Sequence, residues 1–176
     1  PRVAVILLNW NQERDTAECL ESLRRASGVA VRPLVVDNGS APEGVDRLAR
    51  RFPEADVIRL PENRGFAAGN NVGIARALGG DATHILLLNN DTLVDAGFLP
   101  PLLAALDSDQ VGVVGPKILC HPEVTRIWFA GGLLDWRTGR QWHQGAGETD
   151  QGQWDAPQGV DYISGCCLLA SAGTFR

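Results

Sequence analysis

The chain has 176 residues, of which 44% are hydrophobic and 21% are charged, and its formal net charge at pH 7 is -5. This length suits one α/β domain over residues 1–176 and not two comfortable domains, and because no run approaches about 18 apolar residues we expect no transmembrane segment. The negative charge argues against a nucleic-acid binder, which carries a basic patch or stripe.

Apolar strand patterns alternate with helical patterns over the first 120 residues. Short apolar runs predict buried strands at 3–8, 33–36, 57–60, 84–88 and 111–114. Helices are predicted over 14–25, from a capping-box pattern at Ser40 to Phe52, over 66–78, and from an Asp95 cap to Leu106. This alternation predicts a mostly parallel sheet with helices on both faces.

The pattern changes in the last third of the chain. Residues 127–142 predict a hairpin around a turn at 135–139, and residues 148–159 predict a surface loop rich in Gly, Gln and Asp. Strand-like composition returns at 160–163 and 166–170. We therefore expect a small antiparallel part in this C-terminal third.

Polar side chains follow four successive predicted strands. These segments are Asn9-Trp10-Asn11, Asp37-Asn38-Gly39-Ser40, Asn63-Arg64-Gly65-Phe66 and Asn89-Asn90-Asp91-Thr92. In open α/β sheets, ligands bind outside the carboxyl ends of the parallel strands. A structural protein needs turns there but does not need this chemistry at every one, so the sequence predicts a ligand site at this edge.

Each of these positions has a functional and a structural interpretation. Trp10 offers a flat face to a nucleobase, or it is a rim tryptophan. Asp37 can accept a hydrogen bond from a base or ribose, or it belongs to a turn. Gly65 opens a helix whose N–H groups can approach a phosphate, or it allows close packing. Asp91 can hold a divalent cation with substrate phosphates completing the shell, or it is a turn residue.

The four cysteines follow neither a zinc-site nor a redox spacing. Cys166 and Cys167 are adjacent in an apolar run, and we interpret them as buried free thiols.

Six segments together resemble glycosyltransferase family 2: VAVILLNWN, LVVDNGS, NRGFAAGNNVGI, LLLNNDT, VGPKIL and YISGCCLLAS. They occur in the family's order at about the right spacings and cover essentially the whole chain. Within the family, the chain looks most similar to bacterial rhamnosyltransferase-like members. The resemblance implies a GT-A fold, which is a Rossmann-like, mostly parallel sheet flanked by helices. It implies a nucleotide-sugar-binding part at 1–120 and the start of an acceptor-side part at 121–176.

The resemblance also implies roles for particular residues. The donor-binding set is Asn9, Trp10, Asn11, Asp37, Gly65, Asn71, Asn90 and Asp91. Asp91 is the implied ligand of Mg²⁺ or Mn²⁺, with Asn89 or Asn90 helping through hydrogen bonds or water. Ser164 and Gly165 would border the acceptor cleft.

The implied reaction is inverting transfer of a sugar from a UDP- or TDP-sugar to a hydroxyl of a glycan or lipid-linked acceptor, in cell-surface polysaccharide synthesis. The implied location is cytoplasmic, with the inner face of the membrane as one setting. The family's catalytic base usually comes from a Glu-Asp pair past the strand that matches Ser164-Gly165. We therefore expect the base to lie beyond Arg176 and the chain to be truncated.

Two alternatives stay open. One is a nucleotide-sugar-binding module without catalysis. The other is a sugar-1-phosphate nucleotidyltransferase, which ranks lower because Asn9 to Gln12 lacks the Gly-rich, Arg- and Lys-bearing signature that such enzymes place after the first strand.

Overall fold

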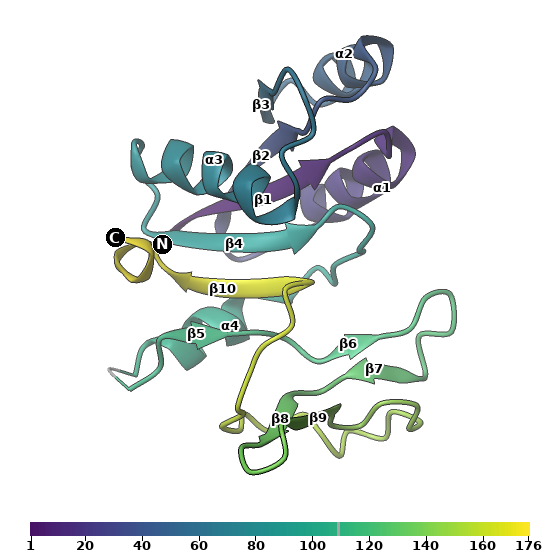
Figure 1. Ribbon diagram of the computed structural model, residues 1–176, viewed down its shortest axis with the longest axis vertical. Helices are drawn as coiled ribbons and strands as arrows, with labels where there is room; N and C mark the ends of the chain where they lie inside the picture. The colour runs from purple at the N-terminus through teal and green to yellow at the C-terminus, as the bar shows by residue number, and fades with distance from the viewer. Residues whose placement is uncertain (109) are drawn as a thin grey trace.

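A six-stranded sheet in the order β3-β2-β1-β4-β10-β5 organises the computed structural model, which describes residues 1–108 and 110–176 (Figure 1). The strands are β1 (Arg2–Asn9), β2 (Ala30–Asp37), β3 (Asp56–Arg59), β4 (His84–Asn89), β5 (Val113–Val114) and β10 (Cys167–Ser171). β1 to β4 are mutually parallel, whereas β10 runs antiparallel to both β4 and β5. The pairing places Asn9 beside Asp37, and Leu8 beside Asn89, so the polar strand ends meet at one edge.

Helices cover both faces of this sheet. They are α1 (Glu13–Arg24), α2 (Pro42–Arg51), α3 (Phe66–Leu78), α4 (Leu99–Leu106) and the 3-10 helix η1 (Ala172–Phe175). Val5 and Leu7 of β1 belong to the apolar cluster that includes α1, α2 and α4 residues, whereas Ile6 belongs to the cluster with α3. Because alternate side chains are buried on opposite faces, the strand reads as one continuous apolar run.

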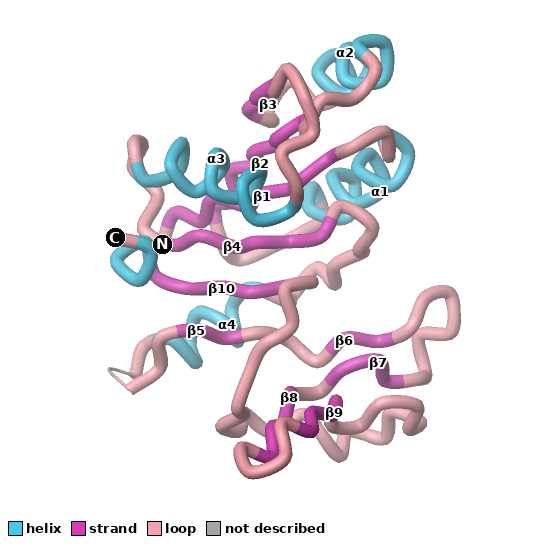
Figure 2. Tube along the Cα trace, viewed as in Figure 1, coloured by secondary structure: helices cyan, strands magenta, loops and turns pink. Residues whose placement is uncertain are grey.

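Two small antiparallel sheets lie outside the main sheet, in a region that consists mostly of loops (Figure 2). β6 (Ile118–Leu119) pairs with β7 (Ile127–Phe129), and β8 (Gly132–Asp135) pairs with β9 (Arg140–His143). The loop at 148–159 is held by Lys117, which directly precedes β6 and whose Nζ donates to Asp150 at 2.8 Å and also to Asp155. These ion pairs raise the pKa of Lys117 against the opposing effect of burial.

The predicted fold class is confirmed, including the antiparallel C-terminal part. The last strand, however, returns to the main sheet between β4 and β5. Residues 160–163 do not form the predicted strand, because Tyr162 makes an isolated bridge with Gly132 instead. The predicted hairpin is shorter than 127–142, since β7 pairs with β6 and the hairpin is formed by β8 and β9.

Both predicted caps at Ser40 and Asp95 are wrong. α2 begins at Pro42 with Ala41 at the N-cap, because the Ser40 hydroxyl is used by the loop after β1. α4 begins at Leu99, because Asp95 Oδ1 instead accepts a hydrogen bond from the Gly97 N–H and closes a turn. The strand predicted at 111–114 is also shorter, with β5 starting at Val113.

The close approach of α3 to the sheet gives a stability prediction. A Cβ at Gly73 would lie 2.5 Å from Ile6 Cγ2 and 3.1 Å from Val36 Cγ2, both fully buried. Gly73→Ala gains about 1 kcal/mol of helix propensity, but forcing a methyl into this core costs about 1–3 kcal/mol. We expect a lower free energy of unfolding in urea.

The matched control is Gly44→Ala in α2, where the added Cβ meets the flexible end of Glu13. This variant should be neutral or more stable. Equal stability of the two variants would contradict the tight α3–sheet contact.

Candidate functional site

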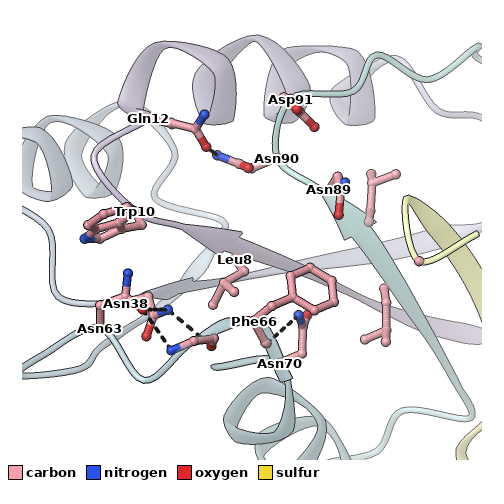
Figure 3. A pocket seen from close by; sticks show the side chains of 14 residues that line it. Leu8, Trp10, Gln12, Asn38, Asn63, Phe66, Asn70, Asn89, Asn90 and Asp91 are labelled. Carbon is pink, nitrogen blue, oxygen red and sulfur yellow. Dashed lines mark hydrogen bonds between the residues drawn. The ribbon is translucent and has the colours of Figure 1, made fainter. Parts of the chain in front are cut away.

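A cleft of about 330 Å³ opens where β1, β2 and β4 end and β10 begins (Figure 3). Its lining includes six side-chain amides, two aromatic rings and one carboxylate, together with leucine and glycine positions. The polar and aromatic members are Trp10, Gln12, Asn38, Asn63, Phe66, Asn70, Asn89, Asn90 and Asp91. Among the described residues, no lysine or arginine lines this cleft.

A chain of buried polar side chains lies beneath the cleft and joins three strand ends. Asn90 Nδ2 donates to Thr16 Oγ1 at 2.9 Å, and Thr16 Oγ1 lies 2.9 Å from Asn9 Oδ1, to which it donates. Asn9 Nδ2 in turn donates to Asp37 Oδ1 at 2.8 Å. All four residues are at most 7% exposed. Such a satisfied network fixes the relative positions of the strand ends, because each bond broken leaves a buried polar group without a partner.

The loop after β1 is held against the loop after β2. Ser40 Oγ accepts hydrogen bonds from the Asn11 N–H at 2.8 Å and from Asn9 Nδ2 at 3.2 Å. Asn11 adopts a φ of 53° and its Oδ1 accepts a bond from the Ala41 N–H at 3.1 Å. These bonds leave the ring of Trp10 at the rim of the cleft, where the residue is 53% exposed.

Two asparagines set the entry into α3. Asn38 Nδ2 donates to Asn63 Oδ1 at 2.9 Å, and Asn63 Oδ1 also accepts a bond from the Gly65 N–H at 2.8 Å. Gly65 precedes the helix with a φ of 80°, a conformation that favours glycine. The N-terminus of α3 is thereby aimed at the cleft, and the first-turn N–H groups of a helix have no intrahelical partner.

Asp91 is the one carboxylate that lines the cleft among the residues the structure describes. It is exposed, and the described part of the chain contains no hydrogen bond or ion pair to its side chain. The described residues also contain no group of three or more His, Cys, Asp or Glu side chains arranged to hold a metal. One carboxylate with neighbouring amide oxygens fits a hard cation such as Mg²⁺, provided that substrate phosphates and water supply the other ligands.

Two thiols lie near this carboxylate and stay protonated at neutral pH. Burial raises the pKa of Cys166 to about 11, and the negative charge of Asp91 adds to this effect. Burial likewise raises the pKa of Cys19 to about 12. The Cys166 carbonyl accepts a hydrogen bond from the Asn89 N–H at 2.8 Å, which ties the start of β10 to the end of β4.

The residues predicted for the site occupy three kinds of position. Five line the cleft: Trp10, Gly65, Asn90, Asp91 and Gly165. Asn9 and Asp37 are buried beneath it. Asn11, Asn71 and Ser164 are outside the lining, and Ser164 Oγ accepts a bond from the Cys166 N–H at 3.2 Å.

Sequence reasoning missed several side chains that the structure places at the site. It did not single out Gln12, Thr16 or Asn70 as site residues, and it gave no role to Asn38, Asn63 or Phe66, although these three stand in the strand-end segments predicted to bind a ligand. Helical spacing was the available signal for Asn70, because it follows Phe66 by four residues and residues four apart share a helix face. Phe66 and Asn70 therefore face the cleft together, and Asn71 points elsewhere.

The chain belongs to glycosyl transferase family 2, whose sequence model matches residues 4–172. It is similar to the uncharacterized glycosyltransferase EpsJ of Bacillus subtilis, with 27% identity over 118 residues that make up 65% of this chain and 33% of that protein. The chain spans about a third or less of the length of the curated relatives it matches.

The fold is that of GT-A-like solved structures. The mannosyltransferase PcManGT of Pyrobaculum calidifontis, in complex with GDP-Man and Mn²⁺, matches with a TM-score of 0.59 and 22% identity over 70% of this chain and 37% of its own. TarS of S. aureus in complex with UDP-GlcNAc matches with a TM-score of 0.59 and 18% identity over 70% and 36%. None of the helices that the structure describes is long and apolar enough to cross a membrane.

The buried polar chain predicts the effect of Thr16→Val, which keeps the shape and removes the hydroxyl. Asn9 Oδ1 then loses its donor and Asn90 Nδ2 loses its shorter bond. We expect a loss of about 1–3 kcal/mol in the free energy of unfolding, measured by urea denaturation. Thr125→Val, at an exposed position, is the control. Equal stability of the two variants would show that these buried hydrogen bonds do not hold the strand ends together.

The thiol near Asp91 gives a second prediction. Asp91→Asn removes one cause of the raised pKa of Cys166, so the pKa falls and the thiolate fraction at pH 8 rises. Alkylation of Cys166 by iodoacetamide, followed by tandem mass spectrometry, should become faster. Asp95→Asn should leave the rate unchanged. An unchanged rate in Asp91→Asn would place its carboxylate away from Cys166.

Proposed function

We propose that the cleft binds the nucleoside diphosphate part of a sugar donor and that the chain is the donor-binding part of an inverting glycosyltransferase. The observation that carries the proposal is the arrangement, among the described residues, of two exposed rings, an amide-rich wall and one carboxylate along the carboxyl edge of a parallel sheet. Family membership and the nucleotide sugars named with the structural neighbours support it.

The nucleoside is assigned to the end of the cleft formed by β1 and β2. The base stacks on the exposed face of Trp10, while Asn63, held in place by the buried Asn38, presents its amide to the nucleoside. Asp37 lies beneath the lining and is 3% exposed, and we assign it to the base from the resemblance to the family: it has lone pairs left after its bonds to Asn9 and the Ser40 N–H, and one of them accepts an N–H of the base. A uracil or thymine base offers that N–H, which is why we propose a UDP- or TDP-sugar.

The diphosphate is assigned to the region between α3 and the end of β4. No cationic side chain of the described chain lines the cleft, so the phosphates need another positive partner. The N-terminal N–H groups of α3 supply part of it, and Gly65 lets the backbone approach. Asp91 would hold Mg²⁺ or Mn²⁺, assisted by the amides of Asn89 and Asn90. That ion, when bound, would act as a Lewis acid that stabilises the leaving diphosphate. The Mn²⁺ complex of the mannosyltransferase supports this choice of metal.

The proposed reaction is direct displacement at the anomeric carbon. An acceptor hydroxyl attacks, a base removes its proton, the nucleoside diphosphate leaves, and the configuration inverts. We assign the base to none of the described residues, because Asp91 is the one carboxylate that they place in the cleft and Asp161 Oδ2 accepts a bond from the Leu134 N–H. Ser164 is assigned to the acceptor side.

The acceptor and the setting are proposed from family membership. We propose a glycan or lipid-linked acceptor used in cell-surface polysaccharide synthesis, with transfer at the cytoplasmic side of a membrane and with rhamnosyltransferase-like members as the nearest subtype. The same cleft serves a binding module without catalysis, so donor binding is the property to test first.

Calorimetric titration with UDP and TDP, with and without MnCl₂, tests the donor site. Wild type should bind one nucleotide in a metal-dependent manner, and Asp91→Asn should weaken that binding by at least about tenfold. Asp95→Asn, the same substitution four residues along, should bind as wild type. Failure of wild type to bind either nucleotide up to about millimolar concentration, a binding free energy of about -4 kcal/mol, would overturn the proposal.

A further inference from the structure

The order of the strands gives the proposed donor a direction. Asn38 follows β2, Trp10 follows β1, Asp91 follows β4, and Gly165 precedes β10, which is the next strand across the sheet. A donor with its base on Trp10 and its diphosphate near Asp91 therefore extends toward Gly165. The sugar of the donor, which follows the diphosphate, lies where β4 and β10 meet.

Gly165 is a glycine that the fold itself does not require. Its φ is not positive, so its backbone conformation is open to other residues. A Cβ built on it meets one side-chain atom within 4 Å, Phe66 Cζ at 4.0 Å, which is ordinary van der Waals contact. By contrast, a Cβ at Gly132 would lie 2.3 Å from the ring of Tyr162. The missing side chain at 165 therefore keeps space in the cleft and does not relieve packing.

Phe66 faces that space from the other side. It is the first residue of α3 and is 56% exposed, although it lines a cleft rather than an open surface. Leu8 lies beside it in Figure 3, and Leu87 belongs to the same lining, so the ring has apolar neighbours in the cleft, while the nearby amide of Asn70 donates to the Phe66 carbonyl at 3.0 Å. An exposed aromatic ring above an apolar floor suits the C–H face of a pyranose ring, which has an apolar surface bordered by hydroxyls.

We propose that Phe66 and Gly165 form the sugar subsite of the donor: the face of the Phe66 ring packs on the C–H face of the sugar, and the bare backbone at Gly165, next to Cζ at the edge of that ring, leaves room for the sugar beside it. This inference rests on the proposed donor site. It assigns to the sugar a position that sequence comparison alone placed on the acceptor side, and it names Phe66 as a residue that determines sugar binding.

The test compares the affinity for a nucleoside diphosphate with that for its sugar conjugate. Calorimetry with MnCl₂ first identifies which of UDP-glucose, UDP-galactose, UDP-GlcNAc, TDP-glucose and TDP-rhamnose wild type binds most tightly. Gly165→Val should weaken binding of that nucleotide sugar by about tenfold relative to the matching diphosphate, since an overpacked pocket costs about 1–3 kcal/mol. Adding Phe66→Ala to Gly165→Val should restore width and return part of the lost affinity.

Matched variants separate this effect from a general disturbance. Gly159 lies outside the cleft and has no positive φ, and a Cβ built on it meets nothing within 4 Å. Gly159→Val should therefore change neither the affinity for the nucleotide sugar nor that for the diphosphate. Phe66→Ala alone should weaken binding of the nucleotide sugar more than binding of the diphosphate. Thermal melting checks that each variant is folded, and Gly165→Ala replaces Gly165→Val if the latter is not.

The outcomes are distinguishable. Loss of affinity for both ligands in equal proportion, or no loss for either, would overturn the sugar subsite and leave the donor site in place. Absence of diphosphate binding by wild type would instead overturn the proposed function on which the subsite rests.

Discussion

The buried hydrogen-bonded chain from Asn90 through Thr16 and Asn9 to Asp37 is the constraint on which the rest of the site depends. Parallel strands end in loops, and loops alone do not hold side chains at fixed positions. Here the ends of β1, β2 and β4 are joined by side chains that have little contact with water. Because the interior strengthens such bonds and penalises their loss, the edge of the sheet becomes rigid, and the exposed groups above it, Trp10 and Asp91, keep their separation.

The described residues give this edge amides and no cationic side chain, so the positive charge that a diphosphate needs must come from other groups. An amide-lined cleft in a chain of net charge -5 does not attract a diphosphate by itself. Oriented N–H groups at the start of α3 and a cation on Asp91 would provide local positive charge only when the ligand is present. The close packing of α3 on β1, which requires glycine at Gly69 and Gly73, brings that helix terminus to the cleft. Packing and ligand chemistry are therefore linked through one helix.

Much of the fold could be predicted from the sequence, because buried parallel strands read as short apolar runs and the helices between them read as periodic ones. The polar strand ends also indicated the edge of the sheet at which the structure places a cleft. Contacts between distant segments could not be predicted. Ser40 looked like a helix cap because nothing in its neighbourhood shows that Asn11 uses its hydroxyl. Thr16 looked like an ordinary helix residue, and the return of β10 into the main sheet depends on pairing with strands about 80 and 55 residues earlier.

Paramagnetic broadening tests the central claim most directly, because it locates the cation and the nucleotide in the same experiment. Amide spectra of the ¹⁵N-labelled chain would be recorded with Mn²⁺ alone, and then with Mn²⁺ and UDP or TDP. The account predicts that broadening centred on Asn89 to Asp91, and reaching Gly65 and Gly165, appears when the nucleotide is added. Broadening that is unchanged by either nucleotide, or that is centred on another acidic region such as Asp150 and Asp155, would contradict it.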